Sequence, residues 1–298
     1  SHVTAVLDFA NRAWRRPLSD ADKKELRSLY DTLRKQDLPH AAAVRQLFAR
    51  VLVAPAFLYR GEKAVPGPKA APVNDWELAT RLSYFLWSSA PDNELKQLAT
   101  TGKLHDPDVL AAQAMRMLKD ERIRRLATEF GCQWLHVRDI ATLDEKSERH
   151  FQTFVDVRDS MQEEVTRFFM DLFQHDRSVM SLLDADHTFV NGELAKHYGL
   201  STGEWGQENG QKNSSAPILL SNSSSDWHRV GGMKTKGRGG ILGFAATLAK
   251  QAGASRTSGI LRGAWLCEVV LGEKLPIPPK GVPVLPEQPP EGLTERQL

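Results

Sequence analysis

The feature that most constrains the fold of this chain is a long amphipathic pattern in residues 155–199, VDVRDSMQEEVTRFFMDLFQHDRSVMSLLDADHTFVNGELAKHYG. Its apolar side chains recur at the three- and four-residue spacing of one helix face. They are Val157, Met161, Val165, Phe168, Phe169, Leu172 and Phe173. The spacing predicts a helix from about Asp156 to His175. Glu164 falls on the same face, so we expect its carboxylate to be either buried with a partner or at the rim of the core.

Helical patterns also dominate the rest of the chain. We predict a mostly α protein: a helical bundle of two packed subdomains, with a small β or irregular excursion and a proline-rich C-terminal strap. The predicted order is a three-helix module (1–60), a linker (61–73), a central helical module (74–200), an excursion rich in Gly, Ser and Asn (201–237), and C-terminal helices with the tail (238–298). One short hairpin is expected around Ile218 to Leu220.

Short polar residues mark several expected helix starts, because their side chains can accept hydrogen bonds from the first free backbone N–H groups. Ser19, Asp75 and Asp120 are such positions. Asp106 is followed by Pro107, a residue suited to the first helical position. The helix that begins at about residue 241 is expected to follow a Gly-rich run.

Bulk composition excludes some classes of function. The 298 residues contain 39 Lys and Arg against 37 Asp and Glu, a formal charge of +2, which predicts no nucleic-acid partner. No apolar window approaches the roughly 18 residues of a membrane span. Cys132 and Cys267 lie in apolar helical patterns, so we interpret both as core thiols. The absence of any Cys-x-x-Cys excludes a Cys-based zinc site or covalent c-type haem within this chain.

A cluster of Asp and His after the long helix is the strongest metal-like signal. Asp184, Asp186 and His187 could hold a divalent cation, with Asn191 or His197 completing the set. The alternative, which we favour, is that the Asp residues form turn hydrogen bonds and Asn191 caps a helix at 192–198.

Arg81 and Glu164 each place a charge on an apolar helix face. Our hypothesis is that they form a buried ion pair across a helix interface, in a structural rather than a catalytic role.

A Gly-rich run with cations precedes the helix expected at Ile241. Its ligand-binding candidates are Lys234, Lys236, Arg238, Gly239 and Gly240. Backbone N–H groups at a helix start, supported by cations, could bind a phosphate, sulfate or carboxylate. The run does not match a Walker pattern, and a connector is the interpretation we favour.

Several short runs resemble one known family. They are RLSYFLW at 81–87, QWL at 133–135, LLDADHTF at 182–189 and HYG at 197–199, with RRPL at 15–18 and PAFLY at 55–59 upstream and RGGIL at 238–242, RTS at 256–258 and RG at 262–263 downstream. Together they resemble planctomycete-type proteins in which cytochrome c domains accompany domains of unknown function, modules 1595, 1592 and 1588 in that order. His187 stands where the family usually has an aromatic residue, and Gly259 where it has proline.

The resemblance implies a cell compartment, a cofactor and a partner, but no particular reaction. It implies an exported protein, periplasmic or at the cell surface, and a c-type haem bound by sequence beyond Leu298. Its implied partner is a cytochrome c domain of the same longer protein, or another redox partner in electron transfer.

Three functional hypotheses follow. The first is a non-catalytic or catalysis-supporting helical module of an exported, cytochrome-associated redox protein. The second is a module that binds a polysaccharide or another anionic ligand, with Trp205 or Trp227 responding to it. The third is a metal-dependent hydrolase built on Asp184, Asp186 and His187.

Overall fold

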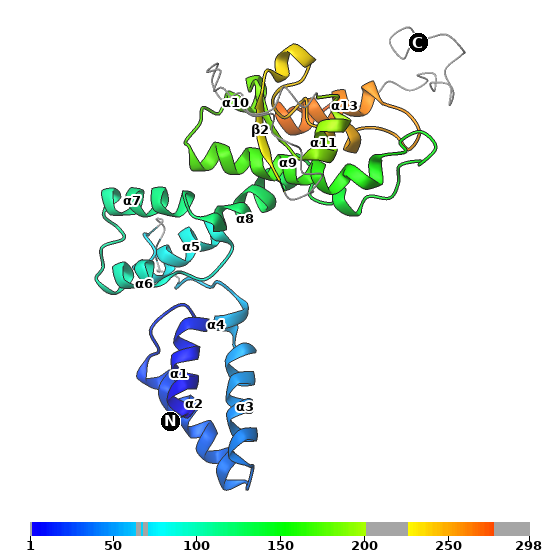
Figure 1. Ribbon diagram of the computed structural model, residues 1–298. Helices are drawn as coiled ribbons and strands as arrows, with labels where there is room; N and C mark the ends of the chain where they lie inside the picture. The colour runs from blue at the N-terminus through cyan, green and yellow to red at the C-terminus, as the bar shows by residue number, and fades with distance from the viewer. Residues whose placement is uncertain (1, 64–66, 68–70, 201–225, 277–298) are drawn as a thin grey trace. The chain divides into compact units, whose positions relative to one another are not determined.

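The computed structural model describes residues 2–63, 67, 71–200 and 226–276, and it divides the chain into two compact units, 1–126 and 127–298. Nearly all regular structure in the described ranges is helical, so the predicted mostly α class is confirmed (Figure 1). None of the described helices is both long enough and apolar enough to cross a bilayer. The predicted hairpin at 218–220 and the proline-rich tail lie outside the described residues.

The first unit begins with a three-helix bundle and one short helical turn. Its elements are α1 (His2–Ala13), α2 (Asp20–Lys35), α3 (His40–Leu52) and α4 (Pro55–Leu58). Apolar side chains from these helices form one core, with Val6, Leu26, Leu47 and Val51 fully or almost fully buried. Ser19 caps α2 as predicted: its side chain accepts from the backbone N–H of Asp22.

A second helical group completes the first unit. It contains α5 (Asp75–Trp87), α6 (Asn93–Thr100), α7 (Pro107–Leu118), the 3₁₀ turn η1 (Glu121–Ile123) and the single turn α8 (Arg124–Leu126). Asp106 caps α7 and Asp120 caps η1, as predicted. Asn74, not Asp75, caps α5, because the Asn74 side chain accepts from Glu77 N–H while Asp75 Oδ1 accepts from Leu104 N–H, 2.8 Å away.

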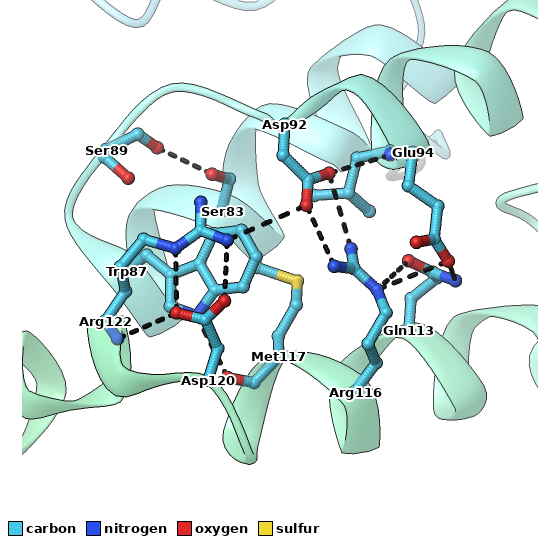
Figure 2. Close-up of polar contacts among 11 residues, drawn as sticks. Ser83, Trp87, Ser89, Asp92, Glu94, Gln113, Arg116, Met117, Asp120 and Arg122 are labelled. Atoms are coloured by element: carbon cyan, nitrogen blue, oxygen red, sulfur yellow. Dashed lines mark hydrogen bonds and ion pairs between the residues drawn. The ribbon is translucent and has the colours of Figure 1, made fainter.

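Trp87 is the centre of this second group (Figure 2). Its indole is fully buried, and its N–H donates to the carbonyl of Met117 over 3.0 Å. The guanidinium carbon of Arg122 lies 3.4 Å from the ring centroid, and Arg122 Nη2 donates to the Asp120 carboxylate over 2.7 Å. Arg116 pairs with Asp92 at 2.9 Å on the same side. A charged layer therefore covers the buried ring and orders the loops between the helices.

The second unit is built around α9 (Phe154–Gln174), which confirms the predicted long helix. The other elements are the π-helix η2 (Ala127–Cys132), η3 (Ile140–Thr142), α10 (Ser181–Asp184), β1 (His187–Val190), α11 (Gly192–His197), β2 (His228–Gly231), η4 (Met233–Lys236), α12 (Ala245–Lys250), α13 (Gly259–Trp265) and the π-helix η5 (Leu266–Val270). α9 contacts η2, η3, β1, α11 and α12 (Figure 1). The predicted apolar face is buried against them, with Phe168 and Phe169 each 1% exposed.

A two-stranded antiparallel sheet, β1 with β2, places residues 187–190 beside residues 228–231. The strand at β1 was not predicted, because HTFV shows no polar–apolar alternation and both faces of the strand are largely buried. Cys132 is buried and forms no disulfide, as predicted, whereas Cys267 is free but only half-buried.

Candidate functional site

A cavity of about 430 Å³ lies in the second unit, between the entry to α9, the end of α11, and α12 with α13. Its polar lining comes from Arg149, His150, Gln152, Thr153, His197, Arg238, Thr257 and Arg262. Its apolar walls come from Phe151, Phe154, Met161, Leu248 and three alanines. The cavity lining therefore combines cationic and apolar side chains.

The charges around this cavity have one sign. Three arginines line it, and no Asp or Glu is among the described residues that do so. Arg238 stacks over the Tyr198 ring at 4.2 Å and donates to the carbonyl of Gly243 over 3.0 Å. The Nε atom of Arg262 is buried and has no hydrogen-bond partner in the described part of the chain. Burial and, to a smaller extent, the nearby Arg238 charge lower the pKa of His197.

A buried carboxyl group lies directly behind the cavity wall. Glu164 is 1% exposed and accepts hydrogen bonds from the hydroxyl groups of Thr188 and Tyr198, the latter over 2.6 Å. The Tyr198 oxygen in turn accepts from the N–H of Ala245, a lining residue, over 2.9 Å. Burial raises the pKa of Glu164 to about 7, although both hydroxyl donors and the Arg238 charge oppose this shift. Of the two positions expected for Glu164, buried with a partner or at the rim of the core, the structure has the buried one.

The predicted pair between Arg81 and Glu164 was wrong. Arg81 is exposed on α5 and forms an ion pair with Glu62, with Nη2 2.6 Å from Oε2. Glu164 is satisfied by neutral hydroxyl groups of its own unit instead. Helical spacing identified the buried face of α9, which carries Glu164. The face of α5 that carries Arg81 is exposed instead, and Phe85 on that face is 67% exposed.

The Gly-rich run contributes one of its five candidate residues to the cavity. Arg238 lines it, whereas Lys234, Lys236, Gly239 and Gly240 do not. A Cβ atom on Gly239 would lie 2.7 Å from the Ala185 carbonyl oxygen, and one on Gly240 would lie 2.4 Å from that of Leu182. These glycines thus permit close backbone packing. The helix expected at Ile241 begins at Ala245.

The metal candidates are dispersed. Asp186 Oδ1 accepts from the N–H of Lys234 at 2.7 Å, and Asp184 is exposed at the end of α10. His187 stacks on Phe168 with its Nε2 3.3 Å from Asp171 Oδ2, while His197 faces the cavity. Within the described ranges no group of three or more His, Cys, Asp or Glu side chains is placed to hold a metal ion. Asn191 caps α11, as the alternative interpretation predicted.

Other residues were missed by the sequence analysis. Arg149 and Arg262 received no functional role, and Tyr198 was considered only within a matching run. No local pattern identifies them, because the three cavity arginines are separated by 89 and 24 positions (238 − 149 and 262 − 238). Of the two tryptophans proposed as ligand reporters, Trp205 lies outside the described residues. Trp227 lies under the Arg167 guanidinium at 4.9 Å.

Three protein families match successive parts of the chain. Residues 3–62 match "PSD5: Protein of unknown function (DUF1595)", residues 73–200 match "PSD4: Protein of unknown function (DUF1592)", and residues 238–298 match "PSCyt3: Protein of unknown function (DUF1588)". The matches follow one another in the order DUF1595, DUF1592 and DUF1588, the order that the resemblance implied. No curated protein and no solved structure matches it significantly.

The module bounds place the cavity at a junction. Residues 149–197 of its lining belong to the DUF1592 module, and residues 238–262 belong to the DUF1588 module. The border between the two compact units, after Leu126, falls inside the DUF1592 match. The second unit therefore joins the later part of one module to the next, and the cavity needs residues of both.

Proposed function

We propose that the second unit binds an organic anion in the arginine-lined cavity. The ligand would carry a carboxylate, phosphate or sulfate group on an apolar body. The observation that carries this proposal is the presence of three arginines, and of no Asp or Glu, among the described lining residues.

The chemistry of both parts of the cavity supports this ligand class. A guanidinium presents several N–H donors in a planar fork that matches carboxylate and phosphate oxygens. Phe154, Met161 and Leu248 offer apolar surface to the remainder of the ligand.

The test is isothermal titration of the full chain with phenyl phosphate and with inorganic phosphate. We expect phenyl phosphate to bind more tightly, since only it can bury apolar surface. Arg262→Gln and Arg149→Gln should each weaken phenyl phosphate binding about tenfold, the loss expected for one charge-assisted hydrogen bond.

Lys234→Gln is the matched control, because it removes the same charge from the same unit but lies outside the cavity. We expect it to leave the affinity unchanged. An equal loss in all three variants would indicate general electrostatic attraction, and the proposal would then be abandoned. The proposal would also be abandoned if neither phenyl phosphate nor inorganic phosphate bound to the chain.

We propose in addition that the chain acts beside a cytochrome c domain in an exported redox protein. The support is the name PSCyt3 of the family that matches residues 238–298, together with the resemblance described above. The test is a reduced-minus-oxidised absorption spectrum of the protein isolated from its natural source and cell compartment. Haem c bands in the exported fraction would support the proposal, and their absence, with no co-purifying cytochrome, would contradict it.

A further inference from the structure

The first unit contains a separate cavity of about 810 Å³. Three segments line it: the end of α1, the stretch from α4 to Glu62, and α5 with its cap. Five aromatic residues contribute, namely Trp14, Tyr59, Trp76, Tyr84 and Phe85. No Leu, Ile, Val or Met is among the described residues that line it. The large apolar groups of this cavity are therefore almost entirely flat rings.

Two of these rings lie on the surface without cover from the described residues. Tyr59 is 69% exposed and Phe85 is 67% exposed. Large aromatic side chains gain considerable free energy from burial, so exposed rings that line a cavity indicate a ligand surface.

The charged groups around the rings are held in place. Arg81 pairs with Glu62, and the two Glu77 carboxylate oxygens accept from the N–H groups of Lys63 and Asn74 at 2.8 and 3.0 Å. The buried Arg15 donates to the carbonyls of Ala56 and Tyr59 at 2.7 and 2.8 Å. Of the other two lining arginines, Arg16 pairs with Asp22 at 2.8 Å and Arg60 lies over the Tyr84 ring at 4.6 Å. The charged groups of this cavity are therefore largely held by other residues of the described chain.

We infer that this cavity binds a neutral oligosaccharide. A pyranose ring has apolar C–H faces and a rim of hydroxyl groups. The faces stack on aromatic rings through dispersion and weak C–H contacts, and the hydroxyl groups exchange hydrogen bonds with paired charged side chains. A lipid or aliphatic peptide would instead be matched by branched aliphatic side chains.

The test is saturation-transfer NMR and isothermal titration of the full chain with cellotetraose, mannotetraose and tetra-N-acetylchitotetraose. We expect at least one to bind. Phe85→Ala and Tyr59→Ala should each weaken that binding about tenfold, which corresponds to one lost stacking contact. Both side chains are mostly exposed, so the fold should persist, and the unfolding temperature of each variant checks this.

Phe130→Ala is the control, because it removes an exposed aromatic ring of the second unit, 50% exposed, and should leave binding unchanged. Arg262→Gln should also leave it unchanged, which separates this inference from the anion site. The inference is overturned if none of the three tetrasaccharides binds at millimolar concentration, or if binding is unaffected by both ring variants.

Discussion

Glu164 is the single residue whose protonation most directly links the core of the second unit to its cavity. Its carboxyl group is buried and contacts Tyr198, whose ring carries Arg238 on one face. Burial favours the neutral form, so folding raises the pKa from 4.5 to about 7. Between pH 4.5 and about 7, the Glu164 carboxyl group is therefore protonated in the folded state and ionised in the unfolded state.

We predict that Glu164→Gln flattens part of the pH dependence of stability. The stabilisation from protonated Glu164 is fully present below pH 4.5 and is lost as the pH rises through about 7. Its total is at most about 3 kcal/mol. Chemical denaturation at pH 4.5 and 8 measures this. The free energy of unfolding of the variant, relative to that of the wild type, should be higher at pH 8 than at pH 4.5. Comparing the two proteins removes the opposite contribution of His197, whose pKa is lowered. If the difference in stability between the two proteins were the same at both pH values, the raised pKa of Glu164 would be contradicted.

Asp171 shows the opposite behaviour. Burial acts to raise its pKa, but contacts with His187 and Arg177 outweigh burial and hold the pKa well below its usual range. Arg177 donates through Nε and Nη2 at 2.5 and 3.0 Å.

Asp171→Asn should therefore destabilise the protein by about 2 kcal/mol at pH 7, since it weakens charge-assisted hydrogen bonds to a buried group. The deficit should shrink as the pH falls below 3.8, because the wild-type carboxylate then loses the same interactions. Urea unfolding at pH 7 and pH 3 measures both values. The neighbouring exposed residue provides the control: Asp176→Asn should change little at either pH. Equal deficits for the two variants would refute the assignment.

At the scale of elements, the turn before α12 depends on glycine for two different reasons. Gly240 has φ +56 and lies against the backbone of Leu182 and Leu183, while Ile241 N–H donates to the Leu182 carbonyl over 2.7 Å. Gly237 has φ +67, and nothing lies within 4 Å of a Cβ atom built there. Gly240 therefore needs both the absence of a side chain and a left-handed backbone, whereas Gly237 needs only the left-handed backbone.

Gly237→Ala should lower the free energy of unfolding by about 1 kcal/mol, the cost of a left-handed conformation. Gly240→Ala should lower it by considerably more and should also weaken binding in the cavity, because the displaced turn carries Arg238. Denaturant titration and phenyl phosphate titration measure the two effects. If Gly237→Ala and Gly240→Ala had the same free energy of unfolding, the close contact of Gly240 with the Leu182 backbone would not contribute to stability.

At the scale of the whole molecule, the described residues of the two compact units form separate apolar clusters. One is formed by residues between Val6 and Ala54, and the other by residues between Ala127 and Trp265. Because each compact unit has its own core, we expect calorimetry to resolve two unfolding transitions.

Core truncation should identify them. Leu47→Ala should lower only the transition of the first unit and Phe168→Ala only that of the second, by about 3 to 4 kcal/mol each. Phenyl phosphate should raise the second transition alone, since a ligand stabilises the unit that binds it. A single transition shifted by both variants would show that the units unfold together.

Much of the helical architecture was predictable because its causes are local. The apolar spacing identified α9 within two residues of its bounds, and Ser19, Asp106, Asp120 and Asn191 cap the predicted elements. Helix spacing and capping depend on neighbours within one turn, which the sequence displays directly. The matching runs likewise predicted the three modules and their order.

The functional geometry was less predictable because it depends on contacts between distant segments. The sequence by itself determined the helical class, the apolar face of α9 and the module order. Only the tertiary structure decided that Arg81 pairs with Glu62, that Gly240 packs on Leu182, and that Arg149, Arg238 and Arg262 meet at one cavity. The reason is physical: periodicity reports which face of an element avoids water, while the partner of a buried charge depends on which elements pack together.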